Sequence, residues 1–205
     1  MGPANSSIFR HEELNVQKSG AVNTGEDINK MTYKEEINRA MRWLAEDSRV
    51  YFIGQSVRFK GTGLFHTLEN VPMEKRIELP VFEDIQMGMT MGMSLEGLVP
   101  VSIYPRMDFL IIAANELVNH LDKMEDMSEG QFKPKVIIRT AIGSIKPLFP
   151  GPQHNGDYCE ALQKMLKRVK VVRLEKKEDI LPEYKKAYES DKSTILVEMP
   201  DLYET

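Results

Sequence analysis

Two neighbouring acidic residues, Glu83 and Asp84, stand where a predicted strand meets a predicted helix. The four residues before them, 79–82, are apolar or neutral, and Ile85 follows them. A carboxyl group in an apolar setting is suited to exchanging a proton with a bound ligand. The alternative is that the two acids only stabilise the N-terminus of the helix through the helix dipole. The residues alone favour this second interpretation.

A histidine in a loop is the other residue whose type could support chemistry. His154 lies in the segment GPQHNG, with proline and glycine on both sides, and an imidazole can act as an acid or a base near neutral pH. The alternative is an exposed histidine without a role. Cys159 is the only cysteine, and we expect it to be a buried packing residue. The chain has no suitable cluster of cysteine and histidine ligands, so we expect it to bind no metal itself.

The elements that must position these residues alternate along the chain. Thr32 and Glu35 have the spacing of a capping box, which predicts a helix that begins at this point. Further helices are predicted at 84–96, 108–124, 157–168 and 177–190, and strands at 50–54, 99–104, 135–140, 169–174 and 194–199. Strands buried on both faces and separated by helices indicate an α/β fold, with a mostly parallel sheet flanked by helices on both faces. Ligands bind beyond the carboxyl ends of the strands in such sheets, and Glu83 lies at a junction of this kind.

Composition narrows the class of protein. The chain has 205 residues, of which 41% are hydrophobic, so it can bury a sizeable core. A net charge of -4 argues against nucleic acid as the main partner, because a face that binds phosphates is normally basic. We find no apolar run long enough to span a bilayer and no export signal. With a single cysteine, the chain suits a reducing, cytoplasmic setting.

Residues 1–30 differ from the rest of the chain. They are polar, rich in Gly, Ser, Asn and charge, and without sustained periodicity. We expect them to form a flexible N-terminal tail, followed by one folded domain over residues 31–205.

The predicted helix after Glu83 carries Gly88 and Gly92, four residues apart and therefore on one face. Glycine costs about 1 kcal/mol relative to alanine inside a helix, so two on one face suggest that another backbone comes very close. That backbone belongs either to the sheet of the same domain or to a helix of another subunit. The methionines around the glycines supply adaptable apolar surface in both cases.

Several segments in a fixed order resemble one enzyme family. They are MTYKEEINRAM, RIELPVFE, GMTMGMSLEGLVPV, DFLIIAANELVNHLDKMEDMSEGQFKPKVIIR and PQH. From Met31 to about Tyr203 the chain resembles the beta subunit of the thiamine-diphosphate-dependent 2-oxoacid dehydrogenases. The matching part is the pyrimidine-binding domain, which is also the middle domain of transketolases. The resemblance implies the thiamine-diphosphate-binding fold.

The resemblance implies roles for four residues. The glutamate that matches Glu83 hydrogen-bonds a ring nitrogen of the aminopyrimidine of thiamine diphosphate and assists proton removal from the thiazolium carbon. Phe109 matches an aromatic residue that packs on the pyrimidine ring, although a Phe in DFLII is otherwise simply core. His154 matches a histidine over the reacting end of the cofactor, and Val81 is expected to line the cofactor site beside Glu83.

The chain also departs from the family. Gln55 stands where an acidic residue usually follows the glycine of the first strand, and that carboxylate has been linked to proton communication between paired active sites. The loop between Arg139 and His154 is longer than usual, and Asn155 and Gly156 replace the common Ser-Gln pair. Substrate choice is therefore expected to differ from that of the pyruvate and branched-chain enzymes.

The family has a further C-terminal domain, which this sequence lacks, as it lacks the Gly-Asp-Gly…Asn pattern that holds Mg²⁺ and diphosphate. We therefore expect a separate, alpha-like subunit to bind Mg²⁺ and the diphosphate, in an α2β2-type heterotetramer. The main hypothesis is a pyrimidine-binding subunit that acts on a 2-oxoacid, by decarboxylation and acyl transfer. The alternatives are half of the site of a transketolase-like carboligase and a non-catalytic subunit for assembly or regulation.

Overall fold

The computed structural model of the chain describes residues 31–146 and 148–205, so the tail expected at 1–30 lies outside the described residues. Its centre is a six-stranded sheet with the order β2-β1-β3-β4-β6-β5, in which every neighbouring pair is parallel. The strands are β1 (Val50–Gly54), β2 (Arg76–Glu78), β3 (Val99–Tyr104), β4 (Ile137–Ala141), β5 (Lys170–Arg173) and β6 (Thr194–Glu198). The predicted parallel sheet is confirmed.

The sequence of each strand matches its place in the sheet. Every residue of the central strands β3, β4 and β6 is buried, as expected of strands covered on both faces. The edge strands β2 and β5 are short and partly exposed, which limits their unpaired edges.

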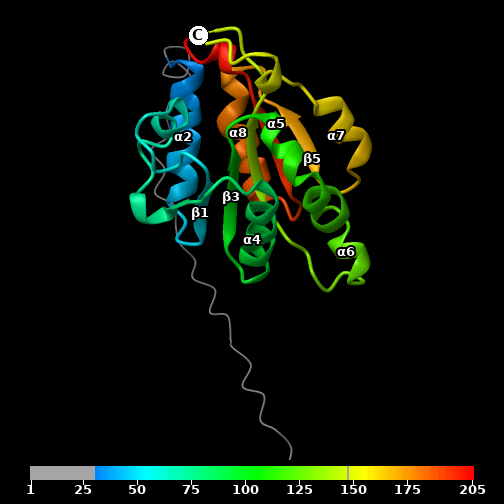
Figure 1. Ribbon diagram of the computed structural model, residues 1–205. Helices are drawn as coiled ribbons and strands as arrows, with labels where there is room; N and C mark the ends of the chain where they lie inside the picture. The colour runs from blue at the N-terminus through cyan, green and yellow to red at the C-terminus, as the bar shows by residue number, and fades with distance from the viewer. Residues whose placement is uncertain (1–30, 147) are drawn as a thin grey trace, which may run out of the picture.

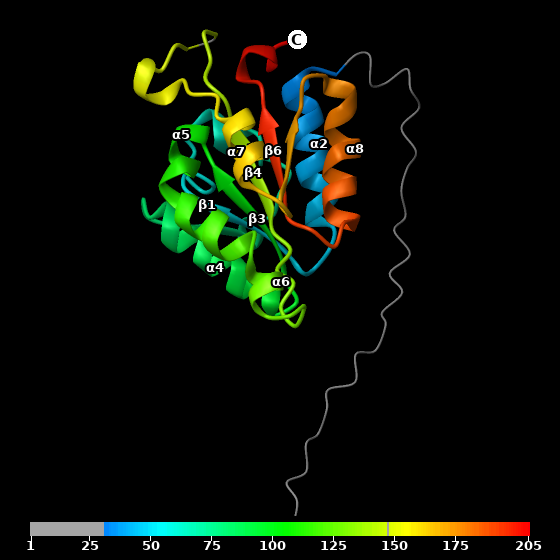
Figure 2. The same cartoon turned by 90° about the vertical axis from the view of Figure 1, so that its right-hand side faces the viewer.

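Helices cover both faces of the sheet (Figures 1 and 2). The helices α2 (Tyr33–Ala45) and α8 (Lys177–Glu189) lie side by side on one face. The other face is covered by α4 (Glu83–Leu95), by α7 (Cys159–Met165) and by a helical segment at 107–121. That segment consists of α5 (Met107–Leu110), η2 (Ile111–Ala113) and η3 (Glu116–Leu121). The short elements are α3 (Gly63–His66), η1 (Met73–Lys75), α6 (Met124–Met127), η4 (Pro152–His154) and η5 (Pro200–Leu202).

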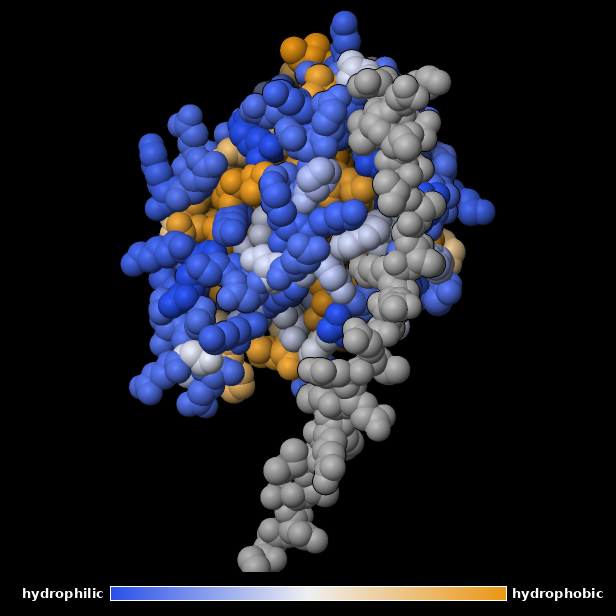
Figure 3. Space-filling view, turned by 180° about the vertical axis from the view of Figure 1, so that it is seen from behind, coloured by the Kyte–Doolittle hydropathy of each residue, from blue (hydrophilic) through white to orange (hydrophobic). Residues whose placement is uncertain are grey.

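The outer surface of α2 and α8 differs from their inner surface. Figure 3 looks onto this face of the molecule, where hydrophilic residues predominate around smaller apolar patches. Beneath it, Ile37, Met41, Ile180 and Tyr184 are fully buried in the core on this side of the sheet. Burial of this amphipathic pair provides the apolar driving force that holds both helices on the sheet.

The predicted start of the first helix is confirmed in detail. Thr32 Oγ1 accepts a hydrogen bond from Glu35 N at 3.3 Å, and Glu35 Oε2 accepts one from Thr32 N at 2.7 Å. The helix predicted at 108–124 is confirmed only in part, because α-helical, 3₁₀ and π turns follow one another there. Its buried side chains, Leu110, Ala113, Leu117 and Leu121, keep the helical spacing that the sequence shows, whereas the type of each turn depends on tertiary packing.

The segment before Glu83 is not the buried strand that its residues suggest. Strand β2 ends at Glu78, and Pro80 has no N–H with which to continue the ladder. Val81 and Phe82 therefore face outward, with exposed fractions of 68% and 55%. In the described part of the chain, no helix has the length and apolar character needed to cross a bilayer.

Candidate active site

Glu83 is the first residue of α4 and is only 3% exposed. Its place beyond the carboxyl end of β2 is where parallel sheets bind ligands. Asp84 beside it is exposed, and its Oδ1 accepts a hydrogen bond from Ile85 N at 2.8 Å. The two acids therefore differ as expected: Glu83 is placed inward, and Asp84 has the role of a helix-end carboxylate.

The side chain of Glu83 has a single hydrogen-bond partner among the described residues. Gln55 Nε2 donates to Glu83 Oε1 at 2.9 Å, and no described residue bonds Oε2. The prediction that Val81, Phe82 and Ile85 surround Glu83 with buried apolar side chains is wrong, because all three residues are exposed. A buried carboxyl group with one oxygen held and one unpaired can accept a hydrogen bond from a ligand ring nitrogen or donate one to it.

The end of β1 places Gln55 against Glu83. Gly54 lies so close to β3 that a Cβ atom there would be 2.3 Å from the carbonyl oxygen of Ile103, a distance that only glycine permits. Ser56 follows in a left-handed conformation with φ of 60°. Glu78 then fixes the turn, because its Oε1 and Oε2 each accept a backbone N–H at 2.6 Å, from Ser56 and Arg58.

Gln86, one turn along α4, joins the helix to the sheet. Its Nε2 donates to Ser102 Oγ at 3.1 Å and to the carbonyl oxygen of Ile103 at 3.0 Å. The Tyr104 hydroxyl donates to the backbone carbonyl of Glu83 at 3.3 Å, and burial raises the pKa of this phenol, so that it stays protonated. These bonds fix the N-terminal turn of α4 over the seam between β1 and β3.

Phe109 and His154 meet on the same edge of the sheet. Phe109 belongs to α5, which follows β3, and His154 ends η4 in the loop after β4. Their ring centroids are 5.3 Å apart at an interplanar angle of 70°, an edge-to-face contact. The structure therefore brings together two of the predicted residues that are distant in sequence. Val81, Phe82 and Glu83 lie apart from this pair in the sequence, at the start of α4.

Asp108 holds the loop of His154 in place. Both of its carboxylate oxygens accept the N–H of Gly156, at 3.2 and 3.3 Å, and Oδ1 also accepts the Tyr158 hydroxyl at 3.3 Å. The negative charge of Asp108 raises the pKa of the Tyr158 phenol. This anchor was not identified from the sequence, although an acid directly before Phe109, after a buried strand, is a signal for it.

Arg106 is a second residue that the sequence reasoning missed. It follows β3, and its Nη1 donates to the carbonyl of Ile142 at 3.3 Å and to Ser144 Oγ at 3.2 Å. Ser144 Oγ in turn donates to the carbonyl of Leu148 at 2.9 Å. Arg106 thus ties α5 to the long loop after β4, and a cation directly after a buried strand was the available signal.

The glycine face of α4 is open. A Cβ at Gly88 or Gly92 would meet no atom of the described residues within 4 Å. Tight packing of these glycines inside the domain is therefore wrong, and a contact with another chain remains as the prediction. Cys159 is buried, as expected.

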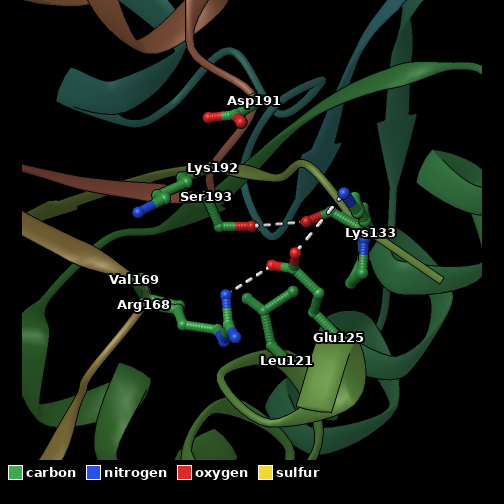
Figure 4. Close-up of a pocket in the computed structure, with 9 residues that line it drawn as sticks. Leu121, Glu125, Lys133, Arg168, Val169, Asp191, Lys192 and Ser193 are labelled. Atoms are coloured by element: carbon green, nitrogen blue, oxygen red, sulfur yellow. Dashed lines mark hydrogen bonds and ion pairs between the residues drawn. The ribbon is translucent and has the colours of Figure 1, made fainter. Parts of the chain in front are cut away.

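A small cavity lies at the opposite edge of the sheet (Figure 4). Its volume is about 20 Å³, and residues at the amino ends of β4, β5 and β6 line it. Glu125 bridges Arg168 at 2.6 Å and Lys133 at 3.5 Å there. This ion-pair cluster is remote from the carboxyl ends of the strands, where Glu83 lies.

Known proteins resemble this chain in both sequence and fold. Residues 29–204 match the family model described as the transketolase pyrimidine binding domain. The chain is 28% identical over 148 residues to the beta subunit of the pyruvate dehydrogenase E1 component of Acholeplasma laidlawii, covering 69% of this chain and 44% of that protein. It is also 28% identical over 118 residues to the 2-oxoisovalerate dehydrogenase subunit beta of Bacillus subtilis (strain 168), covering 55% of this chain and 36% of that one. The chain thus spans less than half the length of these relatives.

A solved structure described as a split gene transketolase, inactive beta4 tetramer, has a similar fold. The TM-score is 0.65 at 16% identity, and the match covers 83% of this chain and 52% of that chain. At this identity the likeness shows the fold alone.

Proposed function

Because the chain belongs to the transketolase pyrimidine-binding domain family, we propose that it is the pyrimidine-binding subunit of a split thiamine-diphosphate-dependent enzyme that acts on a 2-oxoacid. The observation that carries this proposal is the carboxyl group of Glu83. It is buried at the carboxyl edge of the sheet, with Oε1 held by Gln55 and Oε2 unpaired among the described residues. This arrangement fits the ring nitrogen of an aminopyrimidine.

Three side chains of this chain would hold the cofactor. Glu83 would hydrogen-bond the aminopyrimidine and move a proton at Oε2, while Phe109 would pack on the pyrimidine ring and Val81 would line its edge. Thiamine diphosphate, when bound, supplies the carbanion chemistry that attacks a carbonyl group and stores electrons. His154, held edge-on by Phe109, would act as acid or base toward the substrate or acyl group.

A second, alpha-like chain completes the site in this proposal. A diphosphate needs a metal ion and backbone N–H donors, which the Gly-Asp-Gly…Asn pattern of the partner domain supplies in the family. Mg²⁺ and the diphosphate would therefore be held by the partner, in an α2β2-type assembly. The relatives described as beta subunits support this arrangement.

The exposed face of α4 supports a subunit contact. Ile85, Met89 and Leu95 are exposed along it, and the open glycines lie between them. An apolar groove of about 640 Å³ begins at Leu95 and is also lined by Met124, Met127 and Phe132. Ser128, Glu129 and Gln131 complete the lining of this groove. A surface with several exposed apolar side chains and room for close approach of a backbone suits burial against another subunit.

A second candidate function is that of a carboligase that transfers a two-carbon or acyl unit, and the loop after β4 is the part of the chain that bears on it. A Cβ at Gly143 would lie 1.9 Å from Asn155 Oδ1, so the loop is folded tightly around a residue that departs from the family pattern. A loop that is built differently beside His154 would change the substrate rather than the cofactor.

Co-purification with the diphosphate-binding chain tests the proposal. We expect the complex to bind thiamine diphosphate in the presence of Mg²⁺ and the isolated chain to bind it weakly or not at all, as measured by calorimetry. Tight, Mg²⁺-dependent binding by the isolated chain would contradict the split site. A screen of 2-oxoacids and ketose phosphates for adduct formation would then separate the two candidate reactions.

A further inference from the structure

Gln55 stands where the family usually has an acidic residue, and its side chain contacts Glu83. It is the single described partner of the Glu83 side chain, with Nε2 2.9 Å from Oε1. An amide NH₂ can only donate, so Oε1 must accept whether or not Glu83 carries a proton. Because the carbonyl oxygen of a neutral carboxyl group is a better acceptor than its hydroxyl oxygen, this bond favours the proton of a neutral Glu83 on Oε2.

We propose that Gln55 is a positioning residue for Glu83, which fixes the plane of the carboxyl group and favours proton exchange at Oε2. This inference rests on the proposed function only for its consequence in catalysis. The contact itself is a property of the chain without cofactor.

The backbone around Gln55 is fixed from both sides. Before it, Gly54 lies against the carbonyl of Ile103, at a distance that no other residue allows. After it, Ser56 adopts a left-handed conformation, which is strained for a residue other than glycine and persists only where the surroundings hold it. Glu78 provides that support by accepting the N–H groups of Ser56 and Arg58. The turn therefore directs the Gln55 side chain toward Glu83, although the backbone conformation of this turn is itself unfavourable.

An acid at this position would behave differently. A glutamate could donate to Glu83 only while it is protonated, and two carboxylates in contact resist ionising together. Gln55 keeps the donor at every pH and adds no charge. The substitution therefore preserves the orientation of Glu83 and removes a titrating neighbour.

The test uses the full chain without cofactor, with Gln55→Glu and Gln55→Leu as variants and Gln163→Glu as the control, because Gln163 is exposed. In ¹⁵N-labelled protein, the Gln55 side-chain NH₂ resonances should shift when Glu83→Ala is introduced and stay in place when Asp84→Asn is introduced.

In Gln55→Glu, the shared proton raises one carboxyl pKa of the pair in the folded state. The stability of this variant is then full below the unfolded pKa of about 4.3 and falls as pH rises through the folded value. Its denaturation midpoint should therefore drop relative to wild type between pH 5 and pH 8, while that of Gln163→Glu follows wild type.

The assembled enzyme provides the functional readout. Gln55→Leu should slow proton exchange at the reactive carbon of bound thiamine diphosphate by about 10-fold to 100-fold, the range expected for loss of a hydrogen bond to a charged group, with cofactor affinity unchanged. Gln55→Glu should recover toward the wild-type rate as pH is lowered, which a purely structural role would not produce. Unmoved Gln55 resonances in Glu83→Ala, or equal pH dependence of Gln55→Glu and Gln163→Glu, would overturn the proposal. Absence of cofactor binding by the complex would instead overturn the proposed function and leave the contact standing.

Discussion

The rings of Phe109 and His154 meet edge to face, with centroids 5.3 Å apart, although Phe109 belongs to α5 and His154 to η4. Phe109 follows β3 and His154 follows β4, and these strands are paired neighbours. Parallel pairing of β3 and β4 thus brings the two side chains to one place beyond their carboxyl ends.

This contact should be measurable in the isolated chain. Aromatic pairs contribute about 0.5–1.5 kcal/mol beyond area burial, so a double-mutant cycle of Phe109→Leu and His154→Gln should show a coupling of that order in the free energy of unfolding. The cycle of Phe109→Leu with His120→Gln is the control, since His120 is exposed on η3. Equal coupling in both cycles would mean that the ring contact contributes nothing.

Gly88→Leu should separate folding from association. A Cβ at Gly88 would meet no atom of the described residues within 4 Å, and a helix gains about 0.5–1 kcal/mol when glycine is replaced by a better helix former. The isolated variant should therefore unfold at or above the wild-type denaturant midpoint. It should fail to co-purify with the diphosphate-binding chain, because the added side chain keeps the second backbone away.

Glu189→Leu is the matched control, because Glu189 is exposed at the C-terminal end of α8. It should assemble as wild type does. If Gly88→Leu also assembled normally, close approach of another subunit at α4 would be wrong.

Cys159 should be unreactive in the folded chain. Burial raises the pKa of its thiol to about 12, with Asp157 adding to the effect. Its contribution to stability is therefore full below the ordinary pKa of 9.0 and is lost as pH rises toward 12. Iodoacetamide at pH 8, followed by mass spectrometry, should modify the unfolded chain quickly and the native chain slowly. Rapid modification of the native chain would contradict the burial of this thiol.

The strand and helix pattern was predictable because it depends on local periodicity. The bounds of β1 and β3 agree with those expected at 50–54 and 99–104, since continuous apolar runs bounded by glycine or proline leave little ambiguity. The end of β2 was not predictable in the same way. Val81 and Phe82 are apolar, so the sequence predicts that they are buried, whereas both are exposed. Their exposure suits contact with a partner chain. Hydrophobic periodicity cannot distinguish residues buried in the core from residues that contact a partner.

The site residues were predicted only through the resemblance, and their roles remain predictions. Phe109 and His154 follow different strands, and their contact depends on strand order, which periodicity does not give. The supporting residues Asp108 and Arg106 were missed because they act through backbone groups of the loop after β4. Hydrogen bonds from a side chain to backbone groups produce no recognisable spacing of residue types in the sequence.

The most direct test of the account concerns Glu83, whose carboxyl group the proposal makes the proton-exchanging group of the cofactor site. Glu83→Gln keeps the shape of the side chain and a partner for Gln55, so the variant should fold, assemble and retain cofactor binding, because the partner holds the diphosphate. An amide cannot exchange a proton with a ring nitrogen, and general acid–base terms are worth about 10²–10⁴-fold.

The measurement is hydrogen–deuterium exchange at the thiazolium carbon of bound thiamine diphosphate, followed by NMR in the assembled enzyme. Asp84→Asn is the control, because a helix-end charge is worth about 0.3–1 kcal/mol and its side chain already bonds the Ile85 N–H. We predict a loss of at least about 100-fold in the exchange rate for Glu83→Gln and a rate near wild type for Asp84→Asn. Wild-type exchange in Glu83→Gln, or a greater loss in Asp84→Asn, would contradict the assignment of Glu83 as the catalytic carboxylate.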